Sequence, residues 1–423
     1  MNSLISKIKI ILADQGLRWR ILFVLGVLIL FRLGASIPIP SVDTQALERF
    51  FSDNQFFGLL NIFSGGGLAN LSIMMLGVGP FITASIIMQL MTLIFPALKE
   101  LFQEEGEAGR RKVAQYSRLL TIPLALMQGF GLLFLLEQQG VLSGLVLSDR
   151  LFNVIVVATG SILLMWLGEL INEYGIGNGV SIIIFAGILA QLPSTISQIW
   201  IIFDPSQIPT YLGFLIMATV IVAAIVVVTE GERPIPITYA KRVRGMKVYG
   251  GVSTYLPIRV NNAGVMPIIF ALSILLFPQM IVNFLSQVSQ PIVRGVSEFI
   301  LSVLNNTWLY AFLYFILVFA FTYFYSAITF DPHAIAENLQ KSGAFIPGVR
   351  PGRSTEDFLA KILTRLTLVG AVFLGLVAML PIIMQAITGI AALAIGGTSL
   401  LIVVSVALDL VKKIEAQTTM REY

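Results

Sequence analysis

The stretch NIFSGGGLANLSIMMLGVGPFI, residues 61–82, places three consecutive glycines before an apolar segment that is interrupted again at Gly77 and at Gly79-Pro80. A glycine-rich run before a helix binds phosphate in P-loop proteins, but that motif ends in Lys and then Ser or Thr. Leu68 and Ala69 stand there instead, so we reject a phosphate site. The apolar segment between the interruptions is too short to cross a membrane. The stretch is therefore either a glycine turn leading into a span or a short half-helix packed inside a bundle.

The composition of the whole chain is that of a membrane protein. Hydrophobic residues make up 57% of the 423 residues, charged residues make up 12%, and the mean hydropathy is +0.89. Soluble domains carry about 25% charged residues, and a helix needs about 20 apolar residues to cross a bilayer. We predict an all-α polytopic fold with ten transmembrane helices, at approximately residues 20–37, 75–95, 117–136, 150–171, 179–197, 211–229, 265–285, 308–328, 366–384 and 391–411.

Basic residues predict the orientation of these spans, because Lys and Arg resist translocation and stay on the cytoplasmic side. With the N-terminus inside, most of the 27 Lys and Arg residues fall in the inner loops and the two terminal segments. Arg49, Arg150 and Arg294 fall in outer segments, and Arg32 lies near the outer end of the first span. This asymmetry predicts that both termini are cytoplasmic.

The residue types exclude several kinds of chemistry. The chain has no cysteine, and its one histidine, His333, lies in a predicted inner loop. Neither a zinc site nor a Ser-His triad is expected by the usual routes, so we expect no metal, no cofactor and no enzymatic activity. The middles of the predicted spans carry no charge, whereas a proton- or sodium-driven transporter usually needs a carboxylate at that depth.

The predicted spans divide into two equal groups. A cut in the loop at residues 204–209 leaves five spans in residues 1–204 and five in residues 205–423. Because each half has an odd number of spans, the second half enters from the opposite face, and duplicated halves would form an inverted repeat. Secondary transporters also contain inverted repeats, so a small-solute secondary transporter stays open as the alternative to a channel.

Two predicted inner loops, at about residues 230–264 and 329–365, are long and rich in turns. The first alternates apolar and polar residues on both sides of Arg244-Gly245, which predicts a projecting β-ribbon with a basic tip. In the second, two Pro-Gly pairs predict turns around Arg350. These loops either set the topology alone or also dock a large acidic partner, an ATPase or ribosomal RNA. The candidate partner-binding residues are Lys241, Arg242, Arg244, Lys247, Arg350 and Arg353.

Nine stretches of the chain, in the order in which they occur, carry a resemblance to a known family. They are IPIP (37–40), LLNIFSGGGLANLSIMMLGVGPFITASIIMQL (59–90), EEGEAGRRKVAQYSRLLT (104–121), NEYGIGNGVSIIIFAGI (172–188), YAKRVRG (239–245), LPIRVNNAGVMPIIFA (256–271), NLQKSGAFIPGVRPG (338–352), TRLTLVGA (364–371) and GGTSLLIVVSVALD (396–409). Through them the chain resembles the SecY family, the channel subunits of the bacterial protein-translocation complex, over essentially its whole length.

The resemblance implies an hourglass channel in the bacterial inner (plasma) membrane. Such a channel moves unfolded secretory polypeptides across the membrane and releases transmembrane segments sideways into lipid. The resemblance implies a passive pore, opened by a signal sequence and driven by the ATPase SecA or by the ribosome through ribosomal RNA contacts. It also implies two small membrane partners, SecE and SecG.

The same resemblance implies where the functional residues lie. A plug, a short re-entrant helix that closes the outer funnel, falls on about Asn61 to Ser72, with the glycines as its hinge, and includes Asn61, Ser64, Gly65, Gly66, Gly67, Leu68, Ala69, Asn70, Leu71 and Ser72. The segment from Leu68 to Ser72 carries no charge, as expected of a stopper that rests against an apolar ring. That constriction ring falls on Ile82, Ile86, Ile184, Ile188, Ile269 and Ile402.

A lateral gate is implied between the second and third spans on one side and the seventh and eighth on the other. Gln128 and Asn261 match its polar positions, and a hydrogen bond between them would hold the gate shut. The third polar position of some relatives aligns with Ile87, so a cluster of three polar residues is not expected here.

Overall fold

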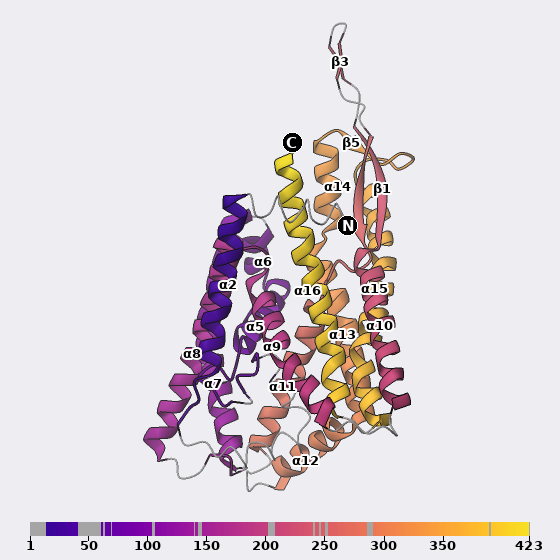
Figure 1. The fold of residues 1–423 in the computed structure, drawn as a ribbon. Helices are drawn as coiled ribbons and strands as arrows, with labels where there is room; N and C mark the ends of the chain where they lie inside the picture. Colours follow the sequence, from indigo (N-terminus) through magenta and orange to yellow (C-terminus); the bar gives the residue numbers. More distant parts are fainter. Residues whose placement is uncertain are drawn as a thin grey trace.

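The molecule is a bundle of long helices with a small β-sheet at one end (Figure 1). The computed structural model describes residues 14–40, 61, 64–68, 70–103, 106–138, 140–142, 146–201, 208–239, 242–244, 247–249, 253–285, 291–388 and 391–422. Each predicted span coincides with a helix, namely α2 (Gln15–Ala35), α5 (Gly79–Ile94), α7 (Gly106–Gln138), α8 (Leu147–Tyr174), α9 (Gly179–Ile201), α10 (Ile208–Glu230), α11 (Met266–Leu285), α13 (Thr307–Thr329), α15 (Arg353–Thr388) and α16 (Ala391–Glu422).

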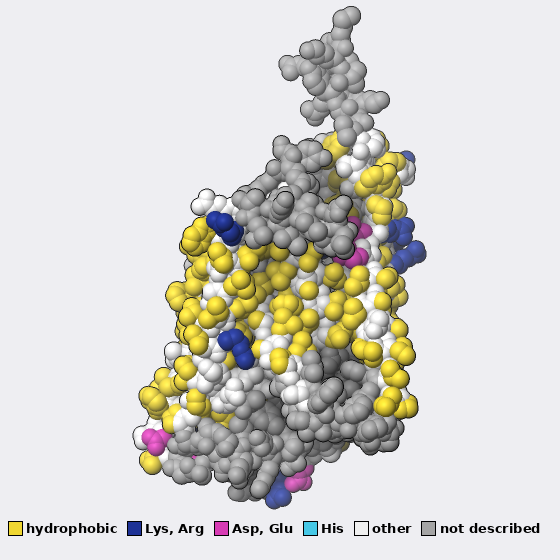
Figure 2. All heavy atoms as spheres, viewed as in Figure 1, with side chains coloured by type: hydrophobic (Ala, Val, Ile, Leu, Met, Phe, Trp, Pro, Cys, Tyr) yellow, Lys and Arg dark blue, Asp and Glu magenta, His cyan; other side chains and the backbone are white. Residues whose placement is uncertain are grey.

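Several helical stretches satisfy a stricter test of length and apolar composition. Among the described residues, Gly106–Gln138, Leu147–Tyr174, Thr307–Lys341 and Arg353–Leu380 each pass alone. A fifth span results if the bent pair Gly79–Thr92 and Pro96–Phe102 counts as one. Hydrophobic side chains cover most of the face drawn in Figure 2, and most of the charged side chains there lie toward its two ends. A membrane-spanning body is therefore well supported, while the full set of ten spans stays a prediction.

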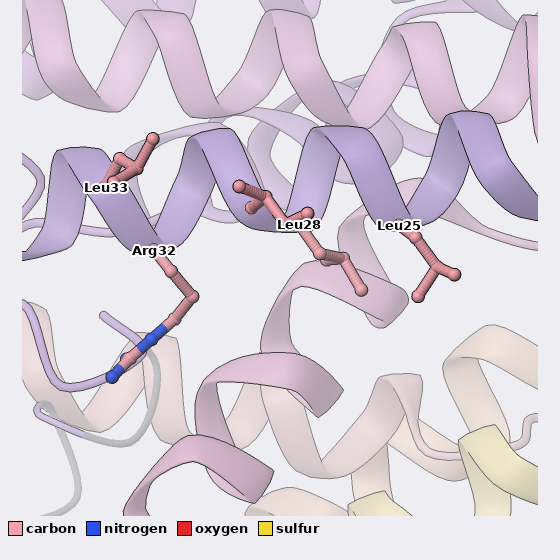
Figure 3. A pocket seen from close by; sticks show the side chains of 5 residues that line it. Leu25, Leu28, Arg32 and Leu33 are labelled. Atoms are coloured by element: carbon pink, nitrogen blue, oxygen red, sulfur yellow. The ribbon is translucent and has the colours of Figure 1, made fainter.

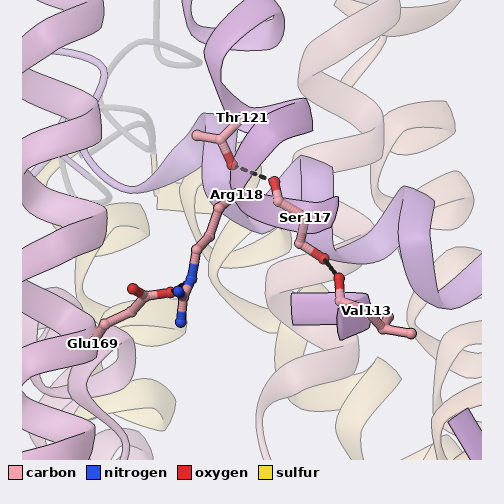
Figure 4. A network of polar contacts seen from close by, with 5 residues as sticks. All are labelled: Val113, Ser117, Arg118, Thr121 and Glu169. Atoms are coloured by element: carbon pink, nitrogen blue, oxygen red, sulfur yellow. Dashed lines mark hydrogen bonds and ion pairs between the residues drawn. The ribbon is translucent and has the colours of Figure 1, made fainter. Parts of the chain in front are cut away.

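The helices α7 and α8 show how polar side chains are accommodated in such a bundle. Arg118 of α7 pairs with Glu169 of α8 near one end, and Arg150 Nη2 of α8 donates to Glu137 Oε1 of α7, 2.7 Å away, near the other (Figure 4 shows the first pair). Beside the first pair, Thr121 Oγ1 donates to the Ser117 carbonyl at 2.8 Å, inside α7. Such internal bonds satisfy buried hydroxyls without a partner helix.

The spanning helices form two groups by their contacts. The helices α2, α5, α7, α8 and α9 lie together, and so do α10, α11, α13, α15 and α16 (Figure 1). Among the described residues, the larger contacts between the groups are those of α5 with α11, α7 with α11, and α9 with α16. The predicted boundary at residue 204 lies outside the described residues, and the inverted-repeat relation stays a prediction.

The predicted β-ribbon is present. Strand β1 (Glu232–Tyr239) pairs antiparallel with β4 (Ser253–Arg259), and β2 (Arg242–Arg244) pairs antiparallel with β3 (Lys247–Tyr249) farther out. The β2–β3 hairpin projects well beyond the helices (Figure 1). The alternation of apolar and polar residues was therefore a correct guide, since Ile235 and Ile237 of β1 face inward and are buried.

The second inner loop joins the same sheet, which we did not predict. Its short strand β5 (Ala344–Phe345) pairs with β1, so the sheet has the order β4-β1-β5. Helix α14 (Pro332–Lys341) precedes β5 and packs on α15. A small apolar core of Ile235, Ile258, Ile346, Leu359, Ile362 and Leu363 lies under this assembly. The two long loops therefore form one folded unit rather than two independent arms.

The sheet and the C-terminal end of α16 lie at the same end of the molecule, and helix α12 (Pro291–Asn305) lies at the opposite end (Figure 1). This is the arrangement expected if the sheet and the C-terminus share the cytoplasmic side. The orientation itself stays a prediction.

Candidate functional site

The six candidate ring isoleucines come from four helices, and all six are buried in the main hydrophobic core of the bundle together with many other apolar residues. Ile82 and Ile86 lie on α5, Ile184 and Ile188 on α9, Ile269 on α11 and Ile402 on α16. Every one of the six is at most 4% exposed. Spacing by four residues places each pair on α5 and α9 on one helical face, as expected.

These four helices also take part in the contacts between the two groups of helices. The contacts of α5 with α11 and of α9 with α16 both join the first group to the second. Each candidate ring isoleucine therefore lies on a helix that contacts the other group. A role as the constriction of a pore stays a prediction.

The glycine-rich segment differs from the short helix that we expected. Asn61 is helical, but residues 64–68 and 70–78 form consecutive turns up to the start of α5, interrupted by a β-bridge at Ser72. Gly65 has φ +67°, Gly66 +84° and Gly77 +57°, and Leu71 also has a positive φ, of 42°. A right-handed helix cannot continue through such residues. Ala69 lies outside the described residues.

The far end of the plug segment is fixed to the residues that follow α2. The Ile39 N–H donates to the Leu71 carbonyl at 2.8 Å, and the Ile73 N–H donates to the Ile37 carbonyl at 3.0 Å. The two bonds form a β-bridge between Pro38, within the IPIP motif, and Ser72. Beyond it, Ser161 Oγ of α8 donates to the Gly77 carbonyl at 2.8 Å.

The apolar side chains of the plug segment pack beside the ring cluster rather than within it. Leu68 and Leu71 are fully buried in a second cluster, with residues of α7 and α8 such as Leu132 and Val157. Contact with the ring's own cluster comes at Gly65, where a β-carbon would lie 2.2 Å from Phe31 Cζ and 3.1 Å from the Gly187 Cα. Phe31 belongs to the ring cluster, so the hinge touches the ring's surroundings while the leucines anchor elsewhere.

The hydrogen bond that we expected between Gln128 and Asn261 is not formed. Gln128 is half-buried on α7, and Asn261 is buried in the turn before α11. Asn261 Nδ2 donates to the Gly264 carbonyl at 3.1 Å, and Asn261 Oδ1 is buried without a partner. The amide nitrogen is therefore engaged within its own turn, while the amide oxygen has no partner. Helix α11 nevertheless contacts both α5 and α7, so the helices of the implied gate do meet.

The candidate partner-binding residues lie at the sheet end of the molecule. Arg242 and Arg244 lie on β2 and Lys247 on β3, while Lys241 falls outside the described residues. Of the last two, Arg350 is exposed in the turn before α15 and Arg353 is exposed at the start of that helix. There the Thr355 hydroxyl donates to the Arg350 carbonyl at 2.9 Å, which fixes the turn.

Two polar residues that contact the plug segment were not predicted from the sequence to do so. Arg32 of α2 donates from Nη1 to the Gly65 carbonyl at 3.0 Å, and Gln191 of α9 donates from Nε2 to the Asn61 carbonyl at 2.9 Å. The position of Arg32 near the outer end of the first span was the one available signal.

Comparison with known proteins places the chain in a family. It matches the SecY family model over residues 72–411. The protein translocase subunit SecY of Synechocystis sp. is 42% identical over 418 residues, which cover 96% of this chain and 93% of that relative. The chain belongs to the SecY family. A second SecY, from Streptomyces coelicolor, is 41% identical over 430 residues and 96% of each chain.

Solved structures agree on the fold of this SecY family member. A structure described as a protein conducting channel superposes with a TM-score of 0.62 at 19% identity, over 93% of this chain and 91% of that one. A SecY structure from work on the plug domain gives 0.65 at 20% identity, over 96% and 93%. Sec61 in the canine ribosome-channel complex gives 0.60 at 18% identity, over 93% and 91%.

Proposed function

We propose that the chain is the protein-conducting subunit of a membrane translocase, with its pore at the seam between the two groups of helices. The observation that carries the proposal is the burial of the six candidate isoleucines. They lie on α5, α9, α11 and α16, four helices that take part in the contacts between the groups, in a chain of the SecY family. The resting pore is closed there by apolar side chains.

Apolar side chains suit a barrier that must block ions at rest and open for a passing polypeptide. A narrow gap lined by branched apolar side chains loses its water, and a dry gap blocks ions. The same side chains form no hydrogen bonds or ion pairs, so a passing polypeptide has only dispersion and packing contacts to displace. We propose that residues 61–72 act as the plug on the outer side of this ring.

The lateral gate in this proposal is the seam of α11 with α5 and α7. Asn261 and Gln128 are its polar positions, and they are not bonded to each other in the resting arrangement. A polar bond between membrane helices averages about 0.6 kcal/mol, so the seam is held mainly by packing. A signal helix that packs against α7 and α11 would compete with that packing and open a path into lipid.

The energy for transport comes from partners in this proposal. The β2–β3 hairpin carries Arg242, Arg244 and Lys247, and the start of α15 and the turn before it carry Arg353 and Arg350, all at the end that we assign to the cytoplasm. We propose that SecA and the ribosome dock there, and that SecE and SecG accompany the subunit in the bacterial inner membrane. Both termini would be cytoplasmic.

Reconstitution separates this function from the alternative, a small-solute secondary transporter. Purified complex is placed in liposomes with SecA, ATP and a secretory protein, and protection of that protein from added protease is measured. ATP-dependent protection is expected. Absence of protection together with ATP-independent uptake of a small solute would support the transporter instead.

A further inference from the structure

Arg32 is an unusual residue for its place in the molecule. It lies near the outer end of the first predicted span, where basic residues are otherwise scarce. A charged side chain at membrane depth is energetically costly and usually marks a functional site. Among the residues that the structure describes, no carboxylate pairs with it. The contact that its guanidinium makes is with the backbone carbonyl of Gly65.

The side chain of Arg32 is not part of the packed core. It projects from the same side of α2 as Leu28 and Leu25, and with Ile29 and Leu33 these residues line an open groove (Figure 3). Removing the guanidinium therefore takes away a hydrogen bond without opening a cavity in the core.

Gln191 makes the matching contact from the other side. It lies on α9, one turn beyond the ring residue Ile188, and donates to the Asn61 carbonyl. A β-carbon built on Gly66 would lie 3.8 Å from Arg32 Nη1 and 3.8 Å from Gln191 Nε2. The glycine turn is thus held between two polar side chains that come from two different helices.

The two ends of the plug segment are held by different kinds of contact. The far end, at Ser72, is held by two backbone hydrogen bonds to residues 37 and 39, and the chain after it runs past α8. At the near end, the Gly65 and Asn61 carbonyls accept hydrogen bonds from the Arg32 and Gln191 side chains, which can rotate away without breaking a bond between two backbones. The near end is therefore the releasable one.

We propose that Arg32 and Gln191 form a latch that holds the hinge turn of the plug in its resting position, and that the latch sets how readily the channel opens. This rests on the proposed channel function and assigns two positioning residues to it. The release swings the glycine turn about the fixed bridge at Ser72.

The test uses the full complex in bilayers, with Arg32→Met and Gln191→Met. Each removes a donor while keeping a long side chain. Arg20→Met, on the inner part of the same helix, and Gln138→Met, at the exposed end of α7, are the matched controls. A hydrogen bond to a charged donor contributes about 1.5–3 kcal/mol. Resting ion conductance should therefore rise about tenfold or more in Arg32→Met, less in Gln191→Met, and not in the controls.

A second measurement separates a latch from general damage. The chain has no native cysteine, so a single cysteine at Ser64 reports directly on exposure of the hinge to a bulky maleimide. The latch variants should label faster at rest and should transport a protein whose signal sequence is weakened. Arg32→Lys, which keeps a donor, should recover part of the resting seal.

The outcomes have distinct meanings. Conductance and labelling equal to the parent, with normal SecA-driven transport, would overturn the latch and leave the channel function standing. If the parent complex itself moves no protein, the channel function fails and the latch fails with it. A rise in both readouts with transport retained supports the latch.

Discussion

At the scale of single residues, the barrier in the resting channel depends on side chains that carry no polar atom. Ile188 is 3% exposed on α9, while its neighbour Leu189 is 38% exposed and points away from the cluster. The two residues are adjacent in the sequence, but their side chains lie on different faces of α9. A pore lining at Ile188 and a lipid-facing site at Leu189 follow from the proposed function.

Replacing Ile188 by Ser, or Ile402 by Asn, should make the resting channel leak. A polar group at the constriction lets water persist there, and each loss of about 1.4 kcal/mol from the barrier raises conductance about tenfold. Conductance of the purified complex in planar bilayers measures this, with Leu189→Ser as the control on the same helix. Leak in the control but not in the two variants would place the constriction elsewhere.

At the scale of elements, the helix α14 is fastened to α15 by a titratable pair. His333 Nδ1 lies 3.0 Å from Glu356 Oε2, beyond the apolar span and beside the sheet. The hydrogen bond to Glu356, helped by its charge, raises the pKa of His333 above 6.5. Because the folded pKa is the higher one, the pairing contributes fully below pH 6.5 and is lost as pH rises through the raised pKa.

The chain has one histidine, so its titration is read without ambiguity. We expect nuclear magnetic resonance of histidine-labelled complex to give a pKa for His333 above 6.5, and Glu356→Gln to lower it. Glu337→Gln removes a weaker and more distant charge and should lower the pKa less. A larger effect at Glu337 than at Glu356 would contradict the pairing.

The turn before α15 should matter for the partner rather than for assembly. Replacing Arg350 by Glu reverses an exposed charge and should reduce SecA-driven transport severalfold while the complex still assembles, because rim charges steer association. Transport into vesicles measures it. Arg294→Glu, an exposed charge reversal on α12 at the opposite end, is the control. Normal transport with Arg350→Glu would remove this residue from the docking surface.

Sequence patterns predicted the elements better than they predicted the contacts between them. Apolar length located every helix that was expected to span, and alternation located β1 and β4. The pairing of β5 with β1 joins residues that are about a hundred positions apart, and nothing local in either strand signals it. The family resemblance implied a helical plug, but the positive φ angles of Gly65 and Gly66 turn the chain there instead.

At the scale of the whole molecule, the proposed pore lies between two groups of helices that touch through α5–α11, α7–α11 and α9–α16. Only the family resemblance allowed the ring residues to be named from the sequence, because an isoleucine that lines a pore and one that faces lipid look alike in an apolar span. Their burial in one hydrophobic core depends on the packing of four helices, which no single stretch encodes. The seam is also where motion must occur if a polypeptide is to pass.

Crosslinking of a stalled polypeptide to single cysteines tests this placement most directly. A secretory chain with a bulky folded end is arrested in the reconstituted channel, and one cysteine in it is paired with a cysteine at Ile86, Ile188 or Ile402 of a chain that otherwise has none. Ile155 and Leu215, 58% and 63% exposed on the outer surface of the bundle, are the controls. The account predicts disulfides from one arrested chain to all three ring positions and to neither control. Disulfides to the controls with none to the ring would contradict it.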